Sequence, residues 1–504
     1  MELLETPIAQ RHKDVYRAFY TTDVRLVDYM VNLLAPEDGE SCLEPAAGSG
    51  CFVDGLLKRS KSLRVTALDL AATAIQTLEK KYDGFSNVDV REQDFIGGEV
   101  GLFDTTGTFD RVIGNPPYGG WQTLSKRALL KARYPGLYVR ETYGIFLAQS
   151  LSKLRVDGRL VFIIPETFLY LHLQKGLRKM LLDGYSIQSV DVFPSSVFPG
   201  VRFGYAKLCI ISIDKRLPRE GHQFTIRQSQ SIEELVGQGG RSVQILQQSL
   251  LQRADFAFPL HGYNAEASLV DSAEVRLVDV ADCVTGIYSG NDQAFLYRSF
   301  ENPRGAAKYR IADASSVHTA EIGDERMHGL SGERILVPVS KGGGERYVKS
   351  PHWFLDWSRE AVKHYRTDKK ARFQNSGFYF RRGIGFPMVT SSRVSASVIH
   401  EHWLFDQSIV GVFPKHPEHF GFLLAFLNSE VCWKLLRQIN PSANSSSKYL
   451  KKLPIILPKA SKLQWFTEVV EGYITKLAAG SNRDLELEQE LEQEVRKTYA
   501  SARL

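Results

Sequence analysis

Between residues 15 and 215, short apolar segments alternate with longer amphipathic ones, and this alternation restricts the possible folds more than any other feature. Residues 64–70, 88–94 and 158–165 have the apolar composition of buried strands. Residues 141–154 have the spacing of a helix, because their large apolar side chains recur every three or four positions. Strands that alternate with helices predict a parallel sheet covered by helices, and so an α/β fold.

The chain has 504 residues, which is too long for one compact domain. Its composition suggests four segments. Residues 1–14 are a polar N-terminal arm, and residues 15–235 are the α/β domain. Residues 236–275 are rich in Gln, Ser and Gly, and we expect them to be a connector. Residues 276–504 then form a second domain.

Composition is that of an ordinary soluble globular protein, with 43% hydrophobic and 24% charged residues. No apolar run approaches the ~20 residues that span a bilayer, so we expect no membrane segment. The five cysteines are scattered without a paired or Cys/His cluster, which argues against disulfides and a metal site and favours a cytoplasmic location. The net charge of +6 permits binding to a polyanion without demonstrating it.

A glycine loop joins a predicted strand at residues 41–45 to a predicted helix at residues 52–58. Gly48 and Gly50 allow the backbone to turn tightly and to approach a ligand closely. Two further strands end in acidic residues. Asp69 is placed to accept hydrogen bonds from a ribose diol, and Asp94-Phe95 offers a carboxylate for an adenine amino group and a ring to cover the purine.

The tetrapeptide Asn115-Pro116-Pro117-Tyr118 follows another apolar run, Val112-Ile113-Gly114. The Asn side chain and a Pro carbonyl are two hydrogen-bond acceptors, and the Tyr ring adds a flat stacking surface. Such a set suits a planar exocyclic amino group. At the carboxyl end of a strand, it would lie where open α/β sheets bind their ligands.

In this order the loop, the two acidic strand ends and the tetrapeptide resemble amino-methyltransferases that use S-adenosylmethionine (SAM). The resemblance is to the gamma class of N6-adenine DNA methyltransferases, of the TaqI and Eco57I types. It is close over residues 15–210 and looser over 270–500. Tyr20-Thr21-Thr22 is similar to the N-terminal segment of that class, although the usual Thr-Pro is Thr22-Asp23 here. The resemblance implies a Rossmann-like SAM-dependent methyltransferase domain followed by a mixed α/β target-recognition domain.

The resemblance also implies roles for particular residues. The motif Val-Phe-Pro occurs twice, and we favour Phe198 over Phe193 as the aromatic residue that stacks on the target base. The implied SAM-binding residues are Thr22, Glu44, Ala46, Gly48, Gly50, Asp69, Asp94 and Phe95, and the implied catalytic residues are Asn115, Pro116, Pro117, Tyr118 and Phe198.

Each motif also has a structural interpretation. The tetrapeptide is compatible with an ordinary turn, and Thr22 with the N-cap of a helix over residues 24–34. The acidic residues could simply end their strands, and either Phe could be a core residue. The basic stretch at 121–140 is either a solvated face or a loop over the active site.

In the second domain, residues 284–295 resemble the start of TaqI- and Eco57I-type recognition domains, and residues 423–430 and 450–458 do so more loosely. Basic residues lie among Ser, Asn and aromatic residues at 381–383, 391–393 and 445–452. Such stretches suit contacts to phosphates and base edges, and equally a solvated surface.

The implied activity is that of an adenine-specific DNA methyltransferase (EC 2.1.1.72) in a restriction-modification system. Its partner would be double-stranded DNA, and the enzyme would act as a monomer with any cognate endonuclease a separate protein. One alternative is methylation of another amino group, such as guanine N2 in RNA or a protein glutamine, and another is a catalytically silent DNA-binding module. Enzymes that methylate guanine N2 or glutamine resemble the chain only in its SAM domain, so their activity would leave residues 276–504 unexplained.

Overall fold

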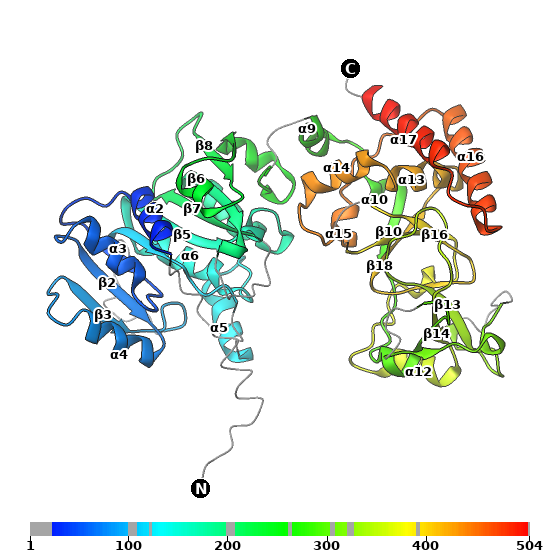
Figure 1. Ribbon diagram of the computed structural model, residues 1–504, viewed down its shortest axis with the longest axis horizontal. Helices are drawn as coiled ribbons and strands as arrows, with labels where there is room; N and C mark the ends of the chain where they lie inside the picture. Colours follow the sequence, from blue (N-terminus) through cyan, green and yellow to red (C-terminus); the bar gives the residue numbers. More distant parts are fainter. Residues whose placement is uncertain are drawn as a thin grey trace, which may run out of the picture. The chain divides into compact units, whose positions relative to one another are not determined.

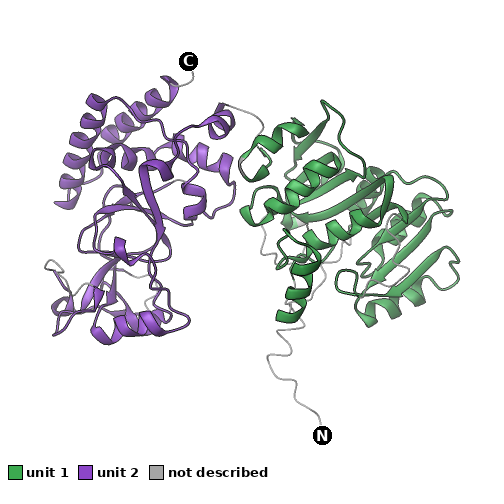
Figure 2. Cartoon of the chain, turned by 180° about the vertical axis from the view of Figure 1, so that it is seen from behind, with its two compact units in different colours: residues 1–262 green, residues 263–504 purple. Residues whose placement is uncertain are grey.

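The computed structural model describes residues 23–98, 108–119, 123–197, 207–260, 265–302, 308–319, 327–389 and 394–501. The chain divides into two compact units, residues 1–262 and residues 263–504 (Figure 2). Each unit has its own sheets and its own buried core.

The first unit is built on a sheet whose nine described strands lie in the order β3-β2-β1-β4-β5-β7-β6-β8-β9 (Figure 1). The strands β3, β2, β1, β4 and β5 are parallel to one another, and β7 runs antiparallel to both of its neighbours, β5 and β6. The strands are β1 (Ser41–Glu44), β2 (Arg64–Asp69), β3 (Val88–Glu92), β4 (Phe109–Gly114), β5 (Leu154–Pro165), β6 (Ser186–Pro194), β7 (Lys207–Asp214), β8 (Gln223–Gln228) and β9 (Arg241–Leu246).

Amphipathic helices pack against this sheet and bury their apolar faces. In α2, for example, Leu26, Met30 and Leu34 are fully buried, at the spacing of one helix face. The described helices of the unit are α2 (Val24–Leu34), α3 (Cys51–Arg59), α4 (Ala72–Lys81), α5 (Leu124–Arg133), α6 (Thr142–Lys153), α7 (Lys175–Gly184) and α8 (Ile232–Val236). The predicted α/β fold of the first unit is therefore confirmed.

The predicted connector at residues 236–275 is wrong. Strand β9 pairs with β8 along its whole length, and the side chain of Ile245 is buried. The first unit thus continues to residue 262. The polar composition that suggested a connector is that of an edge strand, of which only one face needs apolar residues.

The second unit contains two small sheets, β10-β18-β15-β16 and β12-β11-β14-β13-β17, and a group of helices. Its strands are β10 (Ala281–Thr285), β11 (Leu296–Arg298), β12 (Arg310–Ile311), β13 (Leu336–Ser340), β14 (Trp353–Asp356), β15 (Gly383–Pro387), β16 (Ser397–Ile399), β17 (Leu404–Phe405) and β18 (Ile409–Pro414). Its helices are α9 (Ala265–Ser272), α10 (Leu277–Val280), α11 (Asp292–Phe295), α12 (Arg359–Thr367), α13 (Phe420–Leu427), α14 (Glu430–Ile439), α15 (Ser447–Leu450), α16 (Ala460–Ala478) and α17 (Leu485–Ala500). The mixed α/β class expected for this part of the chain is confirmed.

The helical group of the second unit is arranged around α13. Every residue of α13 is buried, which fits a helix that is apolar on all sides. It packs against α14, α16 and α17. An aromatic core around Trp357 lies beneath the five-stranded sheet and α12.

Candidate functional site

Four predicted site residues are brought to one edge of the first unit's sheet. Glu44 and Asp69 end β1 and β2, Asp94 follows β3 by two residues, and Asn115 follows β4 directly. Because these strands are parallel and adjacent, their carboxyl ends meet in the order Asp94, Asp69, Glu44, Asn115. The chain order reverses between β1 and β4, and open α/β sheets bind their ligands in the crevice at such a point.

The loop between β1 and α3 has the backbone that its glycines predicted. Gly48 and Gly50 have φ angles of 55° and 79°. A Cβ atom at Gly50 would lie 2.5 Å from the hydroxyl oxygen of Tyr82 and 2.8 Å from a methyl carbon of Leu78. Only glycine fits there, since both the conformation and the space exclude a side chain. The Tyr82 hydroxyl donates a hydrogen bond to the Gly50 carbonyl at 2.8 Å and so fixes the loop.

Asp69 holds the loop from the neighbouring strand. Its Oδ2 accepts a hydrogen bond from the amide of Gly48 at 2.8 Å, and its Oδ1 accepts one from the amide of Ala71 at 2.9 Å. Each carboxylate oxygen retains a second lone pair for a ligand hydroxyl. The half-buried Ala46 lies in the same loop. Asp69 therefore combines a structural role with the position expected of a ribose-binding residue.

Glu44 is buried beneath the loop with 2% of its surface exposed. Its carboxylate accepts a hydrogen bond from the amide of Val53 in the first turn of α3, while Oε2 has no hydrogen-bond partner in the described part of the chain. Burial raises the pKa of Glu44 well above its usual value, and the nearby Asp69 and Asp54 add to this effect. A buried carboxylate with an unused oxygen suits a cationic group of a ligand.

Asp94 has a basic partner that the sequence did not suggest. Lys126, in α5, donates a hydrogen bond to Asp94 Oδ2 at 2.6 Å, and the amide of Gly97 donates one to Oδ1 at 3.0 Å. Partial burial opposes the charge of Asp94, but these donors together lower its pKa below the usual value. Phe95 is buried and packs against Phe146 at a ring-centroid distance of 5.5 Å.

The tetrapeptide forms a largely buried turn at the end of β4. Oδ1 of Asn115 and the hydroxyl of Tyr118 are both inaccessible to solvent, and Pro116 is buried. The hydroxyl of Thr142, at the start of α6, donates a hydrogen bond to the Pro117 carbonyl. A turn buttressed in this way has fixed acceptor directions, which recognition of an amino group requires.

Two of the predicted residues, Thr22 and Phe198, lie outside the described residues. Helix α2 is capped by Asp23, whose side chain accepts a hydrogen bond from the amide of Arg25 at 2.9 Å. Phe193 is fully buried in β6, opposite Leu208 of β7. Phe193 is therefore a core residue, and Phe198 stays the predicted stacking residue.

Lys126, Arg133 and Thr142 are the site residues that sequence reasoning missed. Arg133 donates hydrogen bonds to the carbonyls of Ile96 and Gly98, so α5 is attached to the turn after β3 at two points. The density of basic residues at 121–140 was the available signal. That signal favoured a solvated face and left an active-site loop as the alternative. The partners of these basic residues could not be predicted, because they depend on the fold.

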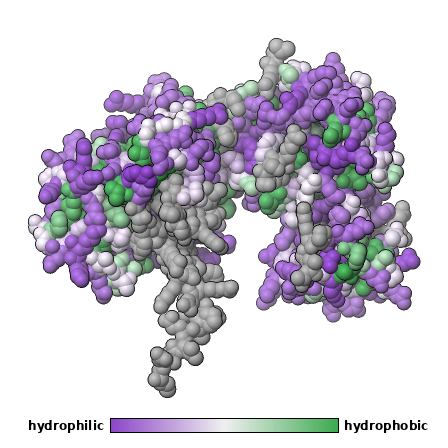
Figure 3. Space-filling view, viewed as in Figure 1, coloured by the Kyte–Doolittle hydropathy of each residue, from purple (hydrophilic) through white to green (hydrophobic). Residues whose placement is uncertain are grey.

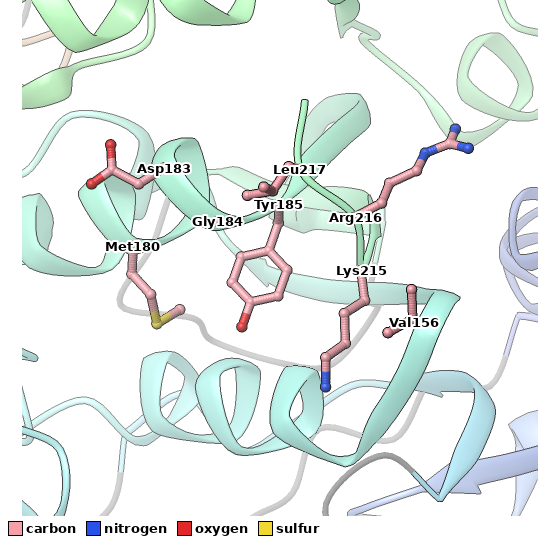
Figure 4. Close-up of a pocket in the computed structure, with 8 residues that line it drawn as sticks. All are labelled: Val156, Met180, Asp183, Gly184, Tyr185, Lys215, Arg216 and Leu217. Carbon is pink, nitrogen blue, oxygen red and sulfur yellow. The ribbon is translucent and has the colours of Figure 1, made fainter. Parts of the chain in front are cut away.

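A cavity of about 610 Å³ in the first unit lies away from these residues (Figure 4). It is lined by residues at the start of β5, before β6 and after β7, at the opposite edge of the sheet. Within the described residues, no group of three or more His, Cys, Asp or Glu side chains is placed to hold a metal ion. No helix in that part of the chain is long and apolar enough to cross a membrane.

The strand-end residues fit the chemistry of SAM. The buried Glu44 suits the ammonium of its methionine part, Asp69 the ribose hydroxyls, and Asp94 the amino group of its adenine. Sheet order, glycine loop and strand-end carboxylates together define a Rossmann-like methyltransferase domain.

Comparisons with known proteins show what this domain is similar to. Residues 56–198 match the family model described as Eco57I restriction-modification methylase. The type II methyltransferase M.HindII of Haemophilus influenzae is 28% identical over 301 residues, which cover 55% of this chain and 54% of that protein. M.HincII, also of Haemophilus influenzae, is 31% identical over 217 residues, or 40% of each chain. The first unit is thus similar, over residues 56–198, to type II modification methylases of the Eco57I type.

One longer alignment extends into the second unit. The type II methyltransferase M.BstVI of Geobacillus stearothermophilus is 24% identical over 458 residues, which cover 78% of this chain and 77% of that protein. With M.HindII and M.HincII, the alignments span about half or less of each relative's length.

Proposed function

We propose that this protein transfers a methyl group from SAM to N6 of an adenine in double-stranded DNA, as the modification enzyme of a restriction-modification system (EC 2.1.1.72). One observation carries the proposal. Asn115-Pro116-Pro117-Tyr118 lies at the carboxyl end of β4, beside the glycine loop and the buried Glu44 at the end of β1. An acceptor set for an amino group and a cradle for a charged cofactor thus meet at one sheet edge.

The acceptors suit the difficulty of the reaction. The exocyclic nitrogen of adenine is a poor nucleophile, because its lone pair is delocalised into the ring. Asn115 Oδ1 and the Pro116 carbonyl would each accept one N6 hydrogen and so favour a pyramidal nitrogen with its lone pair free. Catalysis then rests on positioning and electrostatics. Neither residue is a general base, so the proton passes to solvent after transfer.

Glu44, Asp69 and Asp94 would hold the ammonium group, the ribose hydroxyls and the adenine amino group of the cofactor. The chemical fit of these three side chains to SAM supports this assignment. When bound, SAM supplies the methyl group on its sulfonium sulfur. The residues of the site would hold that methyl group in line with the nitrogen that Asn115 positions. They would also exclude water from the space between the methyl group and the nitrogen. The burial of the Asn115 amide oxygen and of the Tyr118 hydroxyl favours such a dry site.

An adenine inside a duplex cannot reach this edge of the sheet, so the base has to be flipped out. Tyr118 would stack on one face of the extruded base, and Phe198 on the other. The names of the relatives, which are type II methyltransferases, support DNA as the substrate. We assign target recognition to the second unit, because the nine described strands of the sheet that carries the site all lie within residues 1–262.

Transfer of labelled methyl from SAM tests this proposal. The full chain is incubated separately with unmethylated duplex DNA, tRNA and a protein extract, and the product is hydrolysed and analysed. We expect N6-methyladenine in DNA and no label in the other two. Label in tRNA or protein would overturn the proposal in favour of another amino group as acceptor.

A further inference from the structure

The segment from residue 359 to residue 382 in the second unit is strongly basic. It contains eight Lys or Arg residues and two Asp or Glu residues, so its formal charge equals the net charge of +6 of the whole chain. All eight basic side chains are exposed. They are Arg359, Lys363, Arg366, Lys369, Lys370, Arg372, Arg381 and Arg382.

The first part of this segment is a well-anchored amphipathic helix. Ala361, Val362 and Tyr365 of α12 are buried, and the Tyr365 hydroxyl donates a hydrogen bond to the Asp356 carbonyl at 2.6 Å. On the exposed side, the basic residues at positions 359, 363 and 366 have the spacing of one helix face. They extend over about 10 Å at 1.5 Å per residue. The charges are therefore arranged as a row on a fixed support.

The residues after α12 continue this row on an equally fixed backbone. Arg372 exchanges two backbone hydrogen bonds with Tyr288, at 2.8 and 3.2 Å. Oδ1 of Asp368 accepts hydrogen bonds from the amides of Lys370 and Ala371. The side chains of Lys369 and Lys370 stay exposed. The backbone is thus ordered by its neighbours while the ammonium groups face solvent.

The basic residues of this segment differ from those elsewhere in the unit in their pairing. Among the described residues, Arg382 is the one member of the eight that has a carboxylate within 4 Å, that of Glu471. On α14, α16 and α17, by contrast, Lys434, Lys462 and Lys497 each form an ion pair with a glutamate. Hydrophilic residues cover most of the visible face of the second unit (Figure 3). Unbalanced positive charge, rather than polarity, therefore distinguishes residues 359–372.

We propose that the exposed basic side chains of residues 359–372 bind the phosphate backbone of duplex DNA. A row of unpaired cations on a rigid support is the electrostatic footprint of a nucleic-acid surface. DNA is chosen over an anionic membrane because the methyltransferase site of the same chain requires a nucleotide base, so the inference rests on the proposed function. Phosphate contacts of this kind position a protein on DNA without reading its sequence.

Arg366 and Arg372 also have contacts within the unit, since both donate hydrogen bonds to backbone carbonyls. The side chains of Lys363, Lys369 and Lys370 have no such contact among the described residues. These three lysines are therefore the positions at which charge can be removed without disturbing the fold.

The salt dependence of DNA binding by the full chain tests the inference. The triple variant Lys363→Gln, Lys369→Gln, Lys370→Gln is compared with the wild type and with a control, Lys434→Gln, Lys476→Gln, Lys497→Gln, which removes the same charge from α14, α16 and α17. Binding of a fluorescent duplex is measured by anisotropy. Each lost phosphate contact reduces the slope of log affinity against log salt by about 0.9. Between 50 and 200 mM salt, the affinity of the wild type for the duplex should therefore fall by a factor about 40 times larger than that of the triple variant.

The control should keep the wild-type slope, and at saturating DNA the triple variant should methylate at the wild-type rate with a raised KM. A slope in the triple variant equal to that of the wild type would overturn the inference while leaving the proposed function intact. Binding to vesicles of anionic phospholipid that the triple substitution abolishes, with an unchanged DNA slope, would overturn it in favour of a membrane surface. A wild type that binds no duplex and methylates another substrate would instead refute the proposed function.

Discussion

Lys126 Nζ lies 2.6 Å from Oδ2 of Asp94 and so links α5, the next described helix after the Asn115–Tyr118 tetrapeptide, to a carboxylate beyond the end of β3. Both side chains are about 30% exposed, and Arg133 attaches the far end of the same helix to the carbonyls of Ile96 and Gly98. In the proposed enzyme, Asp94 holds the adenine of the cofactor and the tetrapeptide holds the target base. The ion pair therefore fixes α5 to the carboxylate that we propose binds the cofactor.

We expect Asp94→Ala to weaken SAM binding about 10-fold or more, because a hydrogen bond to a charged group contributes roughly 1.5–3 kcal/mol. Lys126→Met should change the affinity much less, because a partly exposed ion pair contributes about 1 kcal/mol or less. Titration calorimetry with SAM measures both variants. Wild-type affinity in Asp94→Ala would contradict the assignment of Asp94 to the cofactor.

Gly50→Ala should destabilise the first unit more than Gly39→Ala does. Both glycines have a φ of +79°, but a Cβ at Gly39 meets no atom within 4 Å, whereas one at Gly50 meets Tyr82 and Leu78. The conformational strain alone costs about 1–2 kcal/mol, and overpacking adds about 1–3 kcal/mol. Urea unfolding measures the difference. Equal losses of unfolding free energy in the two variants would show that the space around the loop is not limiting.

Glu44→Gln should stabilise the protein without ligand and weaken its response to SAM. Because the pKa of Glu44 is raised, its contribution to stability is full below about pH 4.5 and is lost as the carboxyl ionises at higher pH. The glutamine variant should therefore unfold at a higher temperature than the wild type at neutral pH. Added SAM should raise the unfolding temperature of the wild type more than that of the variant. An equal SAM-induced rise in both proteins would rule out Glu44 as a cofactor residue.

Glu166 gives a separate prediction about pH. It follows β5 in a buried 3-10 helix, Glu166–Leu169, and burial raises its pKa to about 7. Between about pH 4.5 and pH 7 the folded protein therefore keeps a proton on Glu166 that the unfolded chain releases. The contribution of Glu166 to the free energy of unfolding is full below about pH 4.5 and is lost as the pH rises through 7. Glu166→Gln should exceed the wild type in unfolding free energy by up to about 3 kcal/mol at pH 8, with a smaller gain at pH 5. If the unfolding free energies of the two proteins changed in parallel with pH, this would contradict the raised pKa of Glu166.

Much of the first unit could be predicted from local sequence. The helix expected over 24–34 is α2, and the strand expected over 64–70 is β2, which ends one residue earlier. These predictions succeeded because apolar periodicity reports which face of an element is buried. Residues 241–246 were missed because β9 is an edge strand with one well-buried side chain, that of Ile245.

The site could be predicted in its parts but not in its connections. Strand-end residues were found because parallel strands bring their carboxyl ends to one edge. The partner of Asp94 was not found, since Lys126 lies 32 residues further along the chain, on a helix whose docking depends on the whole fold. The row of basic residues at 359–372 was missed for a similar reason. Its significance lies in the absence, among the described residues, of a carboxylate within 4 Å of these cations, which sequence order does not show.

A comparison of Asn115→Ala with the wild type shows whether the Asn115 turn takes part in methylation of adenine in DNA. Wild type, Asn115→Ala and the surface control Asn482→Ala are given labelled SAM and unmethylated duplex DNA, with SAM affinity measured in parallel. We expect N6-methyladenine from the wild type and the control. In Asn115→Ala we expect a rate at least about 10²-fold lower, because one preorganised polar contact in a reaction site is worth that much, with SAM affinity nearly unchanged. Near-normal transfer by Asn115→Ala would exclude a catalytic role for Asn115, and a different methylated product from the wild type would exclude adenine N6 as the acceptor.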